Sequence, residues 1–278
     1  MEQWGLTTTA QARNAGLSSQ QLARLADTGV LERLRHAVYR VVGAPPNLND
    51  DLRAAWLALA PARTAQERLA DPDVEVVSHR SAAVVHQLGD LDADRLEFTT
   101  SARKQTRDSQ VRFHRRQLGV GEWTLVDGLP VTTVLATIGD LAAARLDGGH
   151  LAGVVRDAVT THHVDLDEVV AVLSPHAHHY GVPLGQGGTL LTRMLELAGV
   201  PESTLAVGRL VVPYLDPESM RKAVVQAVAQ VGAMDQESMR RALADARDVD
   251  TAVVQATAAA TGQPTPSARK QLGAGEDE

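Results

Sequence analysis

The chain has 278 residues, a formal net charge of −7 and no cysteine, which excludes disulfides, thiolate metal sites and cysteine nucleophiles. No run of eighteen apolar residues occurs and no charged-then-apolar leader opens the sequence. We therefore expect a cytoplasmic protein without a membrane partner. The length allows more than one hydrophobic core, and aromatic residues make up only 3% of the chain, so we expect an aliphatic, largely helical interior in two domains.

The charge is unevenly distributed, and its distribution is more informative than its total. Residues 1–46 contain five arginines against three acids, and residues 103–116 contain six basic residues against one acid, Asp108. Three of the last five residues are acidic. Two segments of an acidic chain can therefore attract an anionic partner.

The first thirty residues predict two short helices. Thr8 and Gln11 have the spacing of a capping box that starts the first helix. Ser18 and Gln21 have the same spacing before a second helix that ends at Gly29.

A β-hairpin is predicted to follow. The runs 30–34 and 38–42 are rich in β-forming residues, and residues 35–37 between them provide the turn. Two helices followed by a hairpin are the elements of a winged helix-turn-helix, which we assign to residues 1–46.

After a linker rich in turn residues at 43–50, the pattern becomes α+β. It predicts a larger mixed α/β domain over residues 51–200. The expected elements are a helix at 52–59, a polar loop or frayed helix at 62–73, a helix at 76–88, strands near 95–99, 110–115 and 123–132, and helices near 133–146, 150–160, 165–173 and 186–198.

The last third of the chain contains an internal repeat. Residues 216–223 (DPESMRKA) recur as 235–242 (DQESMRRA), which predicts paired helices at 217–230 and 236–247. We assign residues 201–261 to a helical extension. Residues 262–278 lack apolar periodicity and are predicted to be a disordered tail.

The second helix has two unlike faces. Leu22, Leu25 and Ala26 share one face, and the opposite face is small and polar, as an approach to base edges in the major groove requires. Gln20 can pair with adenine, and Arg24 with guanine or phosphate. The alternative is a small helical cap whose arginines are merely solvated. The candidate DNA-binding residues are Ser18, Ser19, Gln20, Gln21 and Arg24 of the helix, with Arg33, Arg35, His36 and Arg40 of the hairpin.

Residues 5–12 (GLTTTAQA), 16–25 (GLSSQQLARL) and 29–40 (GVLERLRHAVYR) resemble the N-terminal domain of AbiEi-family antitoxins. The segments 54–61 (AAWLALAP) and 77–83 (VSHRSAA) are similar to the domain that follows it, and the resemblance extends over residues 5–175. The sequence departs from the family at Ala37, where glycine is usual. Because few residues precede Thr8, we expect residues 1–5 to be the stub of an earlier helix, anchored by Trp4.

The resemblance implies a transcriptional repressor and antitoxin of a bacterial type IV toxin–antitoxin system. Such a protein would bind an inverted repeat in its own promoter and counteract a nucleotidyltransferase-like toxin without a stable complex. The family also uses a basic face of its second domain to hold DNA, and strand alternation places Arg112, His114 and Arg116 on one face. A solvated sheet face is the alternative. The candidate phosphate-contacting residues are these three, with Arg103, Lys104 and Arg107 in the preceding loop.

Other motifs point only weakly to chemistry. The histidines at 162–163 and 176–179 lack metal-ligand spacing, and the glycine-rich run 185–189 lacks the Lys-Ser/Thr of a phosphate loop. Adjacent Ser78 and His79 do not make a catalytic arrangement, and no Glu-x-Lys triplet occurs. We therefore predict no catalytic residue, metal or cofactor, and a protein that is not an enzyme. The alternatives are a winged-helix regulator with a ligand-sensing second domain and an enzyme that carries a DNA-targeting module.

Overall fold

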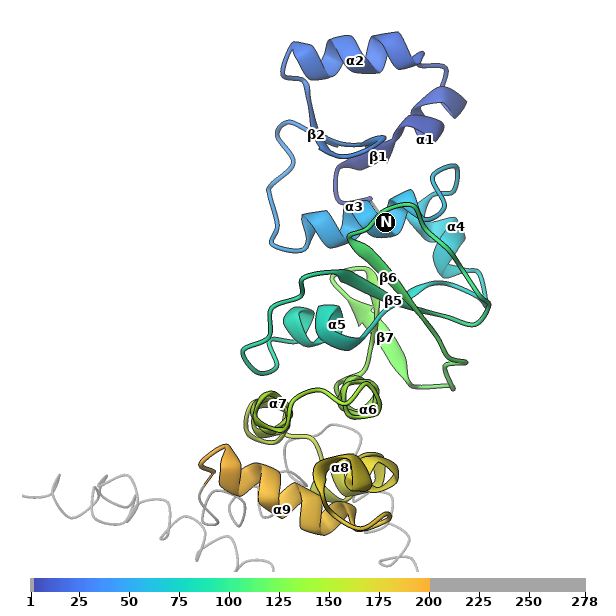
Figure 1. Cartoon of the computed structure of the whole chain (residues 1–278). Coiled ribbons are helices and arrows are strands. Elements are labelled where there is room, and N and C mark those ends of the chain that lie inside the picture. Colours follow the sequence, from blue (N-terminus) through green and yellow to red (C-terminus); the bar gives the residue numbers. More distant parts are fainter. Residues whose placement is uncertain (1–2, 201–278) are drawn as a thin grey trace, which may run out of the picture. The chain divides into compact units, whose positions relative to one another are not determined.

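The structure is a computed structural model that describes residues 3–200 (Figure 1). These residues lie within one compact unit of the chain. The predicted helices at 217–230 and 236–247, the extension at 201–261 and the tail at 262–278 fall outside the described residues. Within the described part the fold class is α+β, as predicted, with helices and two separate β-sheets.

The predicted order of two helices and a hairpin is confirmed for the first forty residues. Both predicted capping boxes are present, at Thr8 with Gln11 and at Ser18 with Gln21. The strands form an antiparallel sheet in the order β1-β3-β2. The elements are β1 (Leu6–Thr8), α1 (Thr9–Asn14), α2 (Ser19–Asp27), β2 (Leu31–Arg35) and β3 (Val38–Val41).

The expectation of a helical stub at residues 1–5 is wrong where the structure describes it. Trp4 and Gly5 form a turn, and β1 follows directly and pairs with β3. Trp4 does act as an anchor: its indole N–H donates to the carbonyl oxygen of Asp127 over 2.7 Å, and its ring meets that of Trp56 edge-on at 6.1 Å. The N-terminal residues thus extend the sheet instead of adding a helix.

A five-stranded mixed sheet follows, in the order β6-β5-β4-β8-β7. The helix predicted at 76–88 is partly wrong, because Val76 and Val77 are buried in the centre of this sheet and the helix begins only at His79. The strand predicted at 123–132 is a hairpin whose turn is Asp127-Gly128, a strong hairpin signal. The elements are α3 (Asp50–Ala58), α4 (Ala65–Leu69), β4 (Val76–Val77), α5 (His79–Val85), β5 (Leu96–Thr100), β6 (Val111–Arg115), β7 (Trp123–Val126) and β8 (Leu129–Thr132).

The remaining described residues form a helical layer with its own aliphatic core. Gly187 allows two of its helices to approach closely, since a Cβ there would lie 2.2 Å from the carbonyl oxygen of Val170. The predicted helices are confirmed as α6 (Val134–Ala143), α7 (Gly148–Thr160), α8 (Leu166–Leu173) and α9 (Gly187–Leu197), with the 3-10 helix η1 (Ser174–Tyr180) before α9.

The three-stranded sheet lies between two cores. Leu22 of α2 packs with Ala12 and Leu31 on one face, whereas Leu6 and Val38 on the other face belong to the core that contains Trp56 of α3. Figure 1 shows α2 and α3 on opposite sides of this sheet. The outer face of α2 is therefore directed away from the five-stranded sheet.

The hairpin turn generates a stability prediction. Ala37 has a φ of 60°, the left-handed region where a Cβ costs about 1–2 kcal/mol and where glycine is at ease. Ala37→Gly should therefore raise the free energy of unfolding by about 0.5–1 kcal/mol in urea denaturation. Ala23→Gly, in the exposed middle of α2, should lower it by about 1 kcal/mol. A destabilised Ala37→Gly variant would contradict the turn geometry.

Candidate nucleic-acid interface

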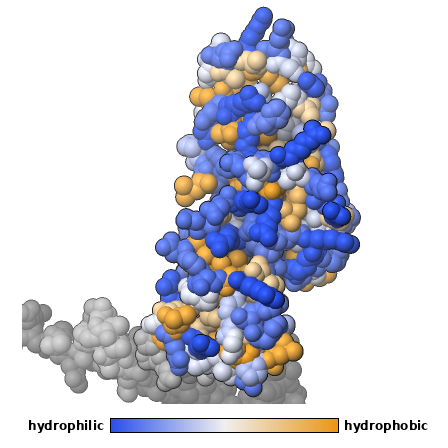
Figure 2. Space-filling model, viewed as in Figure 1, coloured by the Kyte–Doolittle hydropathy of each residue, from blue (hydrophilic) through white to orange (hydrophobic). Residues whose placement is uncertain are grey.

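The polar face of α2 is open to solvent. Ser19, Gln20 and Arg24 are exposed, whereas Leu22 is 1% exposed and Leu25 is half-buried against the small core under α2. Figure 2 shows blue, hydrophilic residues among white and orange ones over the surface that α2 forms in Figure 1. The leucines pack the helix against this core and leave its polar side accessible to solvent.

The two capping residues have a different role from the exposed face. Ser18 Oγ accepts from the backbone N–H of Gln21 over 3.2 Å, and Gln21 Oε1 accepts from the backbone N–H of Ser18 over 2.7 Å. These bonds satisfy otherwise unpaired donors at the start of the helix. Ser18 and Gln21 therefore fix where α2 begins, and the exposed side chains of Ser19, Gln20 and Arg24 form the accessible surface.

Arg13 is a residue that the sequence reasoning missed. Its guanidinium crosses from the end of α1 to the first turn of α2, where Nη2 donates to Ser19 Oγ over 2.6 Å and Nε over 3.1 Å. Arg13 is exposed, so a cation lies beside the polar face of α2. The sequence signal for this contact is that Arg13 lies six residues before Ser19, near the end of the first predicted helix and across a predicted turn from the second.

The hairpin turn separates its basic residues into two groups. Strand pairing shifts between Arg33, which faces Tyr39, and Arg35, which faces Val38. Such a bulge re-aims the side chains next to it. Arg33 and His36 stay exposed, with Nη2 of the arginine 3.2 Å from Nδ1 of the histidine.

Arg35 instead binds residues beyond the linker. Its side chain is 9% exposed, and its two terminal nitrogens lie 2.6 Å from a carboxylate oxygen of Asp51 and 2.6 Å from one of Asp108. Burial alone would lower the pKa of Arg35, but the hydrogen bonds to Asp108 and Asp51 outweigh it and raise the pKa. We call these three residues the Arg35 clamp.

Arg40 is also held inside the protein. Nη2 pairs with Glu32 on the neighbouring strand, and Nη1 lies 2.8 Å from Asp50 at the start of α3. Its side chain is 15% exposed. Two of the four basic hairpin residues predicted to meet DNA are therefore directed at acids of the N-terminal turn of α3.

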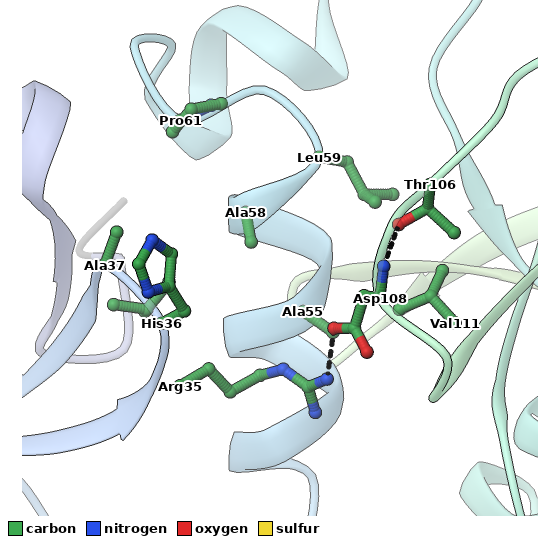
Figure 3. A pocket seen from close by; sticks show the side chains of 11 residues that line it. Arg35, His36, Ala37, Ala55, Ala58, Leu59, Pro61, Thr106, Asp108 and Val111 are labelled. Carbon is green, nitrogen blue, oxygen red and sulfur yellow. Dashed lines mark hydrogen bonds and ion pairs between the residues drawn. The ribbon is translucent and has the colours of Figure 1, made fainter.

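A cavity of about 380 Å³ lies beside the Arg35 clamp (Figure 3). Figure 3 shows His36 and Ala37 of the turn across the cavity from Ala58 of α3, with Arg35 and Asp108 along one edge. The turn therefore does not pack closely against α3. The lining residues are Arg35, His36, Ala37, Val38, Ala55, Ala58, Leu59, Pro61, Thr106, Asp108 and Val111.

The second basic segment is divided between residues paired with acids and exposed residues. Lys104 binds Glu75, and Arg112 lies 3.8 Å from Glu97. Arg103 and Arg107 are exposed in the loop before β6. The predicted common face of Arg112, His114 and Arg116 exists, and carboxylates of the protein itself contact His114 and Arg116 closely, whereas the Arg112 side chain stays 58% exposed.

Those carboxylates belong to a buried polar cluster. His114 lies 3.0 Å from Glu97, and its ring stacks on that of His79 with centroids 3.4 Å apart. Arg116 Nε lies 3.0 Å from Oδ1 of Asp140 on α6. The cluster therefore links β5, β6, α5 and α6 across the junction between the sheet and the helical layer.

Burial dominates the electrostatics of this cluster. It raises the pKa of Asp140 to about 6, against the attraction of Arg116. Burial and the neighbouring His114 lower the pKa of His79 to about 3. Burial would also raise the pKa of Glu97, but hydrogen bonds from His114 and from the backbone N–H of Arg80 lower it.

The motifs that suggested chemistry have structural roles. Ser78 Oγ accepts from Thr99 and contacts His79 Nδ1 at 3.0 Å within buried surroundings. His162 Nε2 contacts the carbonyl oxygen of His86 at 2.8 Å. Across residues 3–200, the histidines and acids do not gather in threes with metal-binding geometry. None of the helices described is both long and apolar enough to cross a bilayer.

Comparisons with known proteins bear on the first part of the chain. Residues 1–42 match the family described as "Transcriptional regulator, AbiEi antitoxin", which confirms the predicted resemblance over those residues. The crystal structure of the RV2827C protein from Mycobacterium tuberculosis is similar over 73% of this chain and 75% of that chain, with 16% identity and a TM-score of 0.42. That likeness is too low to extend the family match beyond residue 42. No curated protein matches the chain.

The polar cluster generates a prediction for pH dependence. Because the pKa of Asp140 is raised to about 6 from 3.8, the native state loses stability through this group as the pH rises between these values. Asp140→Asn should therefore gain stability relative to the wild type as the pH rises from 4 to 7, by about 2 kcal/mol.

His79→Gln should change the pH dependence of stability in the opposite direction to Asp140→Asn. The pKa of His79 is lowered to about 3 from 6.5, so the wild type loses stability through this group as the pH falls between these values. His79→Gln should gain relative stability toward low pH. Urea denaturation of both variants between pH 4 and 7 tests this, and slopes of the same sign would refute the assignment.

Proposed function

We propose that this protein is a DNA-binding antitoxin of a bacterial type IV toxin–antitoxin system that represses its own operon. The observation that carries the proposal is the accessible polar face of α2, with its leucines buried beneath it, inside the segment that matches AbiEi transcriptional regulators. In this proposal residues 1–46 act as a winged helix-turn-helix, and α2 lies in the major groove. No catalytic step is part of the proposed function.

The base-reading residues are Gln20 and Arg24, which can pair with adenine and guanine respectively. Ser19, Arg13 and Arg33 contact the phosphate backbone beside them, because backbone contacts fix the register of a protein on DNA without reading sequence. His36 lies next to Arg33 and supplies a further contact. Arg103 and Arg107 are exposed and contact phosphate if the duplex extends to the loop before β6.

In this proposal five of the candidates named from sequence do not contact DNA. If these residues bound phosphate instead, each would leave its carboxylate partner in the protein. The free energy lost by breaking the ion pair would offset the free energy gained from the phosphate contact. This makes α2 and the outer side of the turn the main contact surface. The five are Arg35, Arg40, Lys104, His114 and Arg116. Arg112 is 58% exposed and stays a candidate phosphate contact with Arg103 and Arg107.

The antitoxin role is supported by the family match at residues 1–42. In this role the protein is cytoplasmic and antagonises a nucleotidyltransferase-like toxin without a stable complex. Co-expression with such a toxin, encoded beside it, should restore growth, and the two proteins should separate on size exclusion. A stable complex, or toxicity unchanged by co-expression, would refute this part.

A regulator that senses a small ligand is the second candidate. The cavity between the hairpin turn and α3 favours it, because a ligand there would contact both the proposed DNA-binding part and the rest of the protein. The neighbouring gene distinguishes the two candidates: a nucleotidyltransferase-like toxin beside the gene supports the antitoxin.

The proposed function predicts protection of DNA upstream of the protein's own gene. Footprinting with the full chain should reveal two half-sites of an inverted repeat, and the affinity should fall steeply as salt rises. Gln20→Ala combined with Arg24→Ala should abolish the footprint, because both side chains are exposed on α2 and their removal leaves the core around Trp56 intact. A footprint that survives this double substitution would move DNA binding elsewhere in the chain.

Arg24 supplies a sharper prediction for the same duplex. Arg24→Ala should weaken binding by about 1–3 kcal/mol in a gel-shift titration if it reads a base. Arg193→Ala is the matched control, since it also removes an exposed arginine. Arg193 lies on α9, a helix that packs into the core of the helical layer and not into the proposed DNA-binding part. Equal affinities for the two variants would remove Arg24 from the interface.

A further inference from the structure

The β2–β3 hairpin is the wing of the proposed DNA-binding part. Ion pairs contribute more than apolar packing to fixing the position of its tip. The base of the hairpin is fixed, because Val38 is 1% exposed within the core that contains Trp56. Its turn instead adjoins a cavity of about 380 Å³ with the small side chains of Ala37, Ala55 and Ala58 in its lining. Packing therefore fixes the root of the hairpin and leaves its tip to the Arg35 clamp.

The clamp joins the tip to two separate elements. Asp51 lies in the first turn of α3, where a negative charge is favourable, and Asp108 lies in the loop before β6. Gln110 also accepts from Arg35 Nη2 over 3.1 Å. A planar guanidinium that binds partners from two elements restricts both its position and its orientation.

The same short segment carries the exposed basic pair. His36 is the next residue after Arg35, and Arg33 Nε lies 3.5 Å from the carbonyl oxygen of Arg35. The bulge between Arg33 and Arg35 directs the two arginines to different partners. Any movement of Arg35 therefore moves the pair that faces solvent.

We propose that Arg35 is a positioning residue for DNA binding: clamped by Asp51 and Asp108, it holds Arg33 and His36 where they meet the phosphate backbone beside α2. The proposal rests on the proposed function. Charge repulsion alone predicts that the two acids, Asp51 and Asp108, weaken DNA binding. In this proposal they strengthen it indirectly, because they hold Arg35 in place.

The test uses that difference in sign. Asp51→Asn combined with Asp108→Asn removes two negative charges, which should tighten binding if only long-range electrostatics acts. The clamp predicts the reverse, a three- to tenfold loss of affinity in ~0.1 M salt for the duplex identified by footprinting, and a similar loss for Arg35→Gln. Adding Arg35→Gln to the two acid substitutions should cause little further loss, because all three remove one interaction.

Salt dependence separates positioning from direct contact. Arg33→Gln should reduce the slope of log K against log salt by about 0.9, the value for one phosphate contact. Arg35→Gln should leave that slope nearly unchanged. Exchanging the charges, with Arg35→Asp and Asp108→Arg, keeps one cation between two carboxylates and should restore most of the affinity. All variants are compared well below their measured melting temperatures.

The possible results are distinct. If the acid variants bind as well as or better than the wild type, or if Arg35→Gln reduces the salt slope by about 0.9, the positioning role is refuted while the proposed function stands. If the wild-type chain binds no duplex, the proposed function itself fails, and the positioning role fails with it.

Discussion

Leu6 and Val38 of the N-terminal sheet are buried in the same core as Trp56 and Leu57 of α3. This contact constrains the rest of the described structure. One face of the three-stranded sheet packs against α3, so α1 and α2 pack against the opposite face. The apolar side of α2 is therefore buried on the sheet, and its polar side is exposed to solvent. The hairpin and α3 therefore do not behave as independent bodies, although a turn-rich linker separates them in sequence.

Acids near the start of α3 reinforce this arrangement. Asp50 and Asp51 bind Arg40 and Arg35 of the hairpin, and the N-terminal position of both acids on the helix favours their negative charge. Acids also pair with basic residues at the five-stranded sheet, where Glu97 and Asp140 face the basic side of β6. A cluster of basic residues in the sequence is thus divided between internal ion pairs and accessible charge, and only the accessible part can attract DNA.

Much of the local structure was predictable from short-range signals. The capping boxes at Thr8 and Ser18 and the alternation on β6 are set by neighbouring residues, and the structure has them as predicted. The errors have identifiable causes. Val76 and Val77 join a strand because distant partners cover them, and residues 6–8 join a sheet because β3 offers them a free edge. The hairpin at Asp127-Gly128 carried a signal that the sequence reasoning overlooked.

The polar face of α2 follows from the amino-acid sequence alone, since it depends only on the helical period of Leu22 and its neighbours. The sequence alone also carries the likeness of the first segment to AbiEi regulators, and the family match over residues 1–42 confirms it. Which arginines remain accessible depends instead on contacts between distant parts of the chain. Arg33 and Arg35 are arginines only two residues apart, yet a bulge and two acids from later in the chain turn Arg35 inward and leave Arg33 exposed. Pairing between charges far apart in sequence depends on the fold, and no local pattern encodes it.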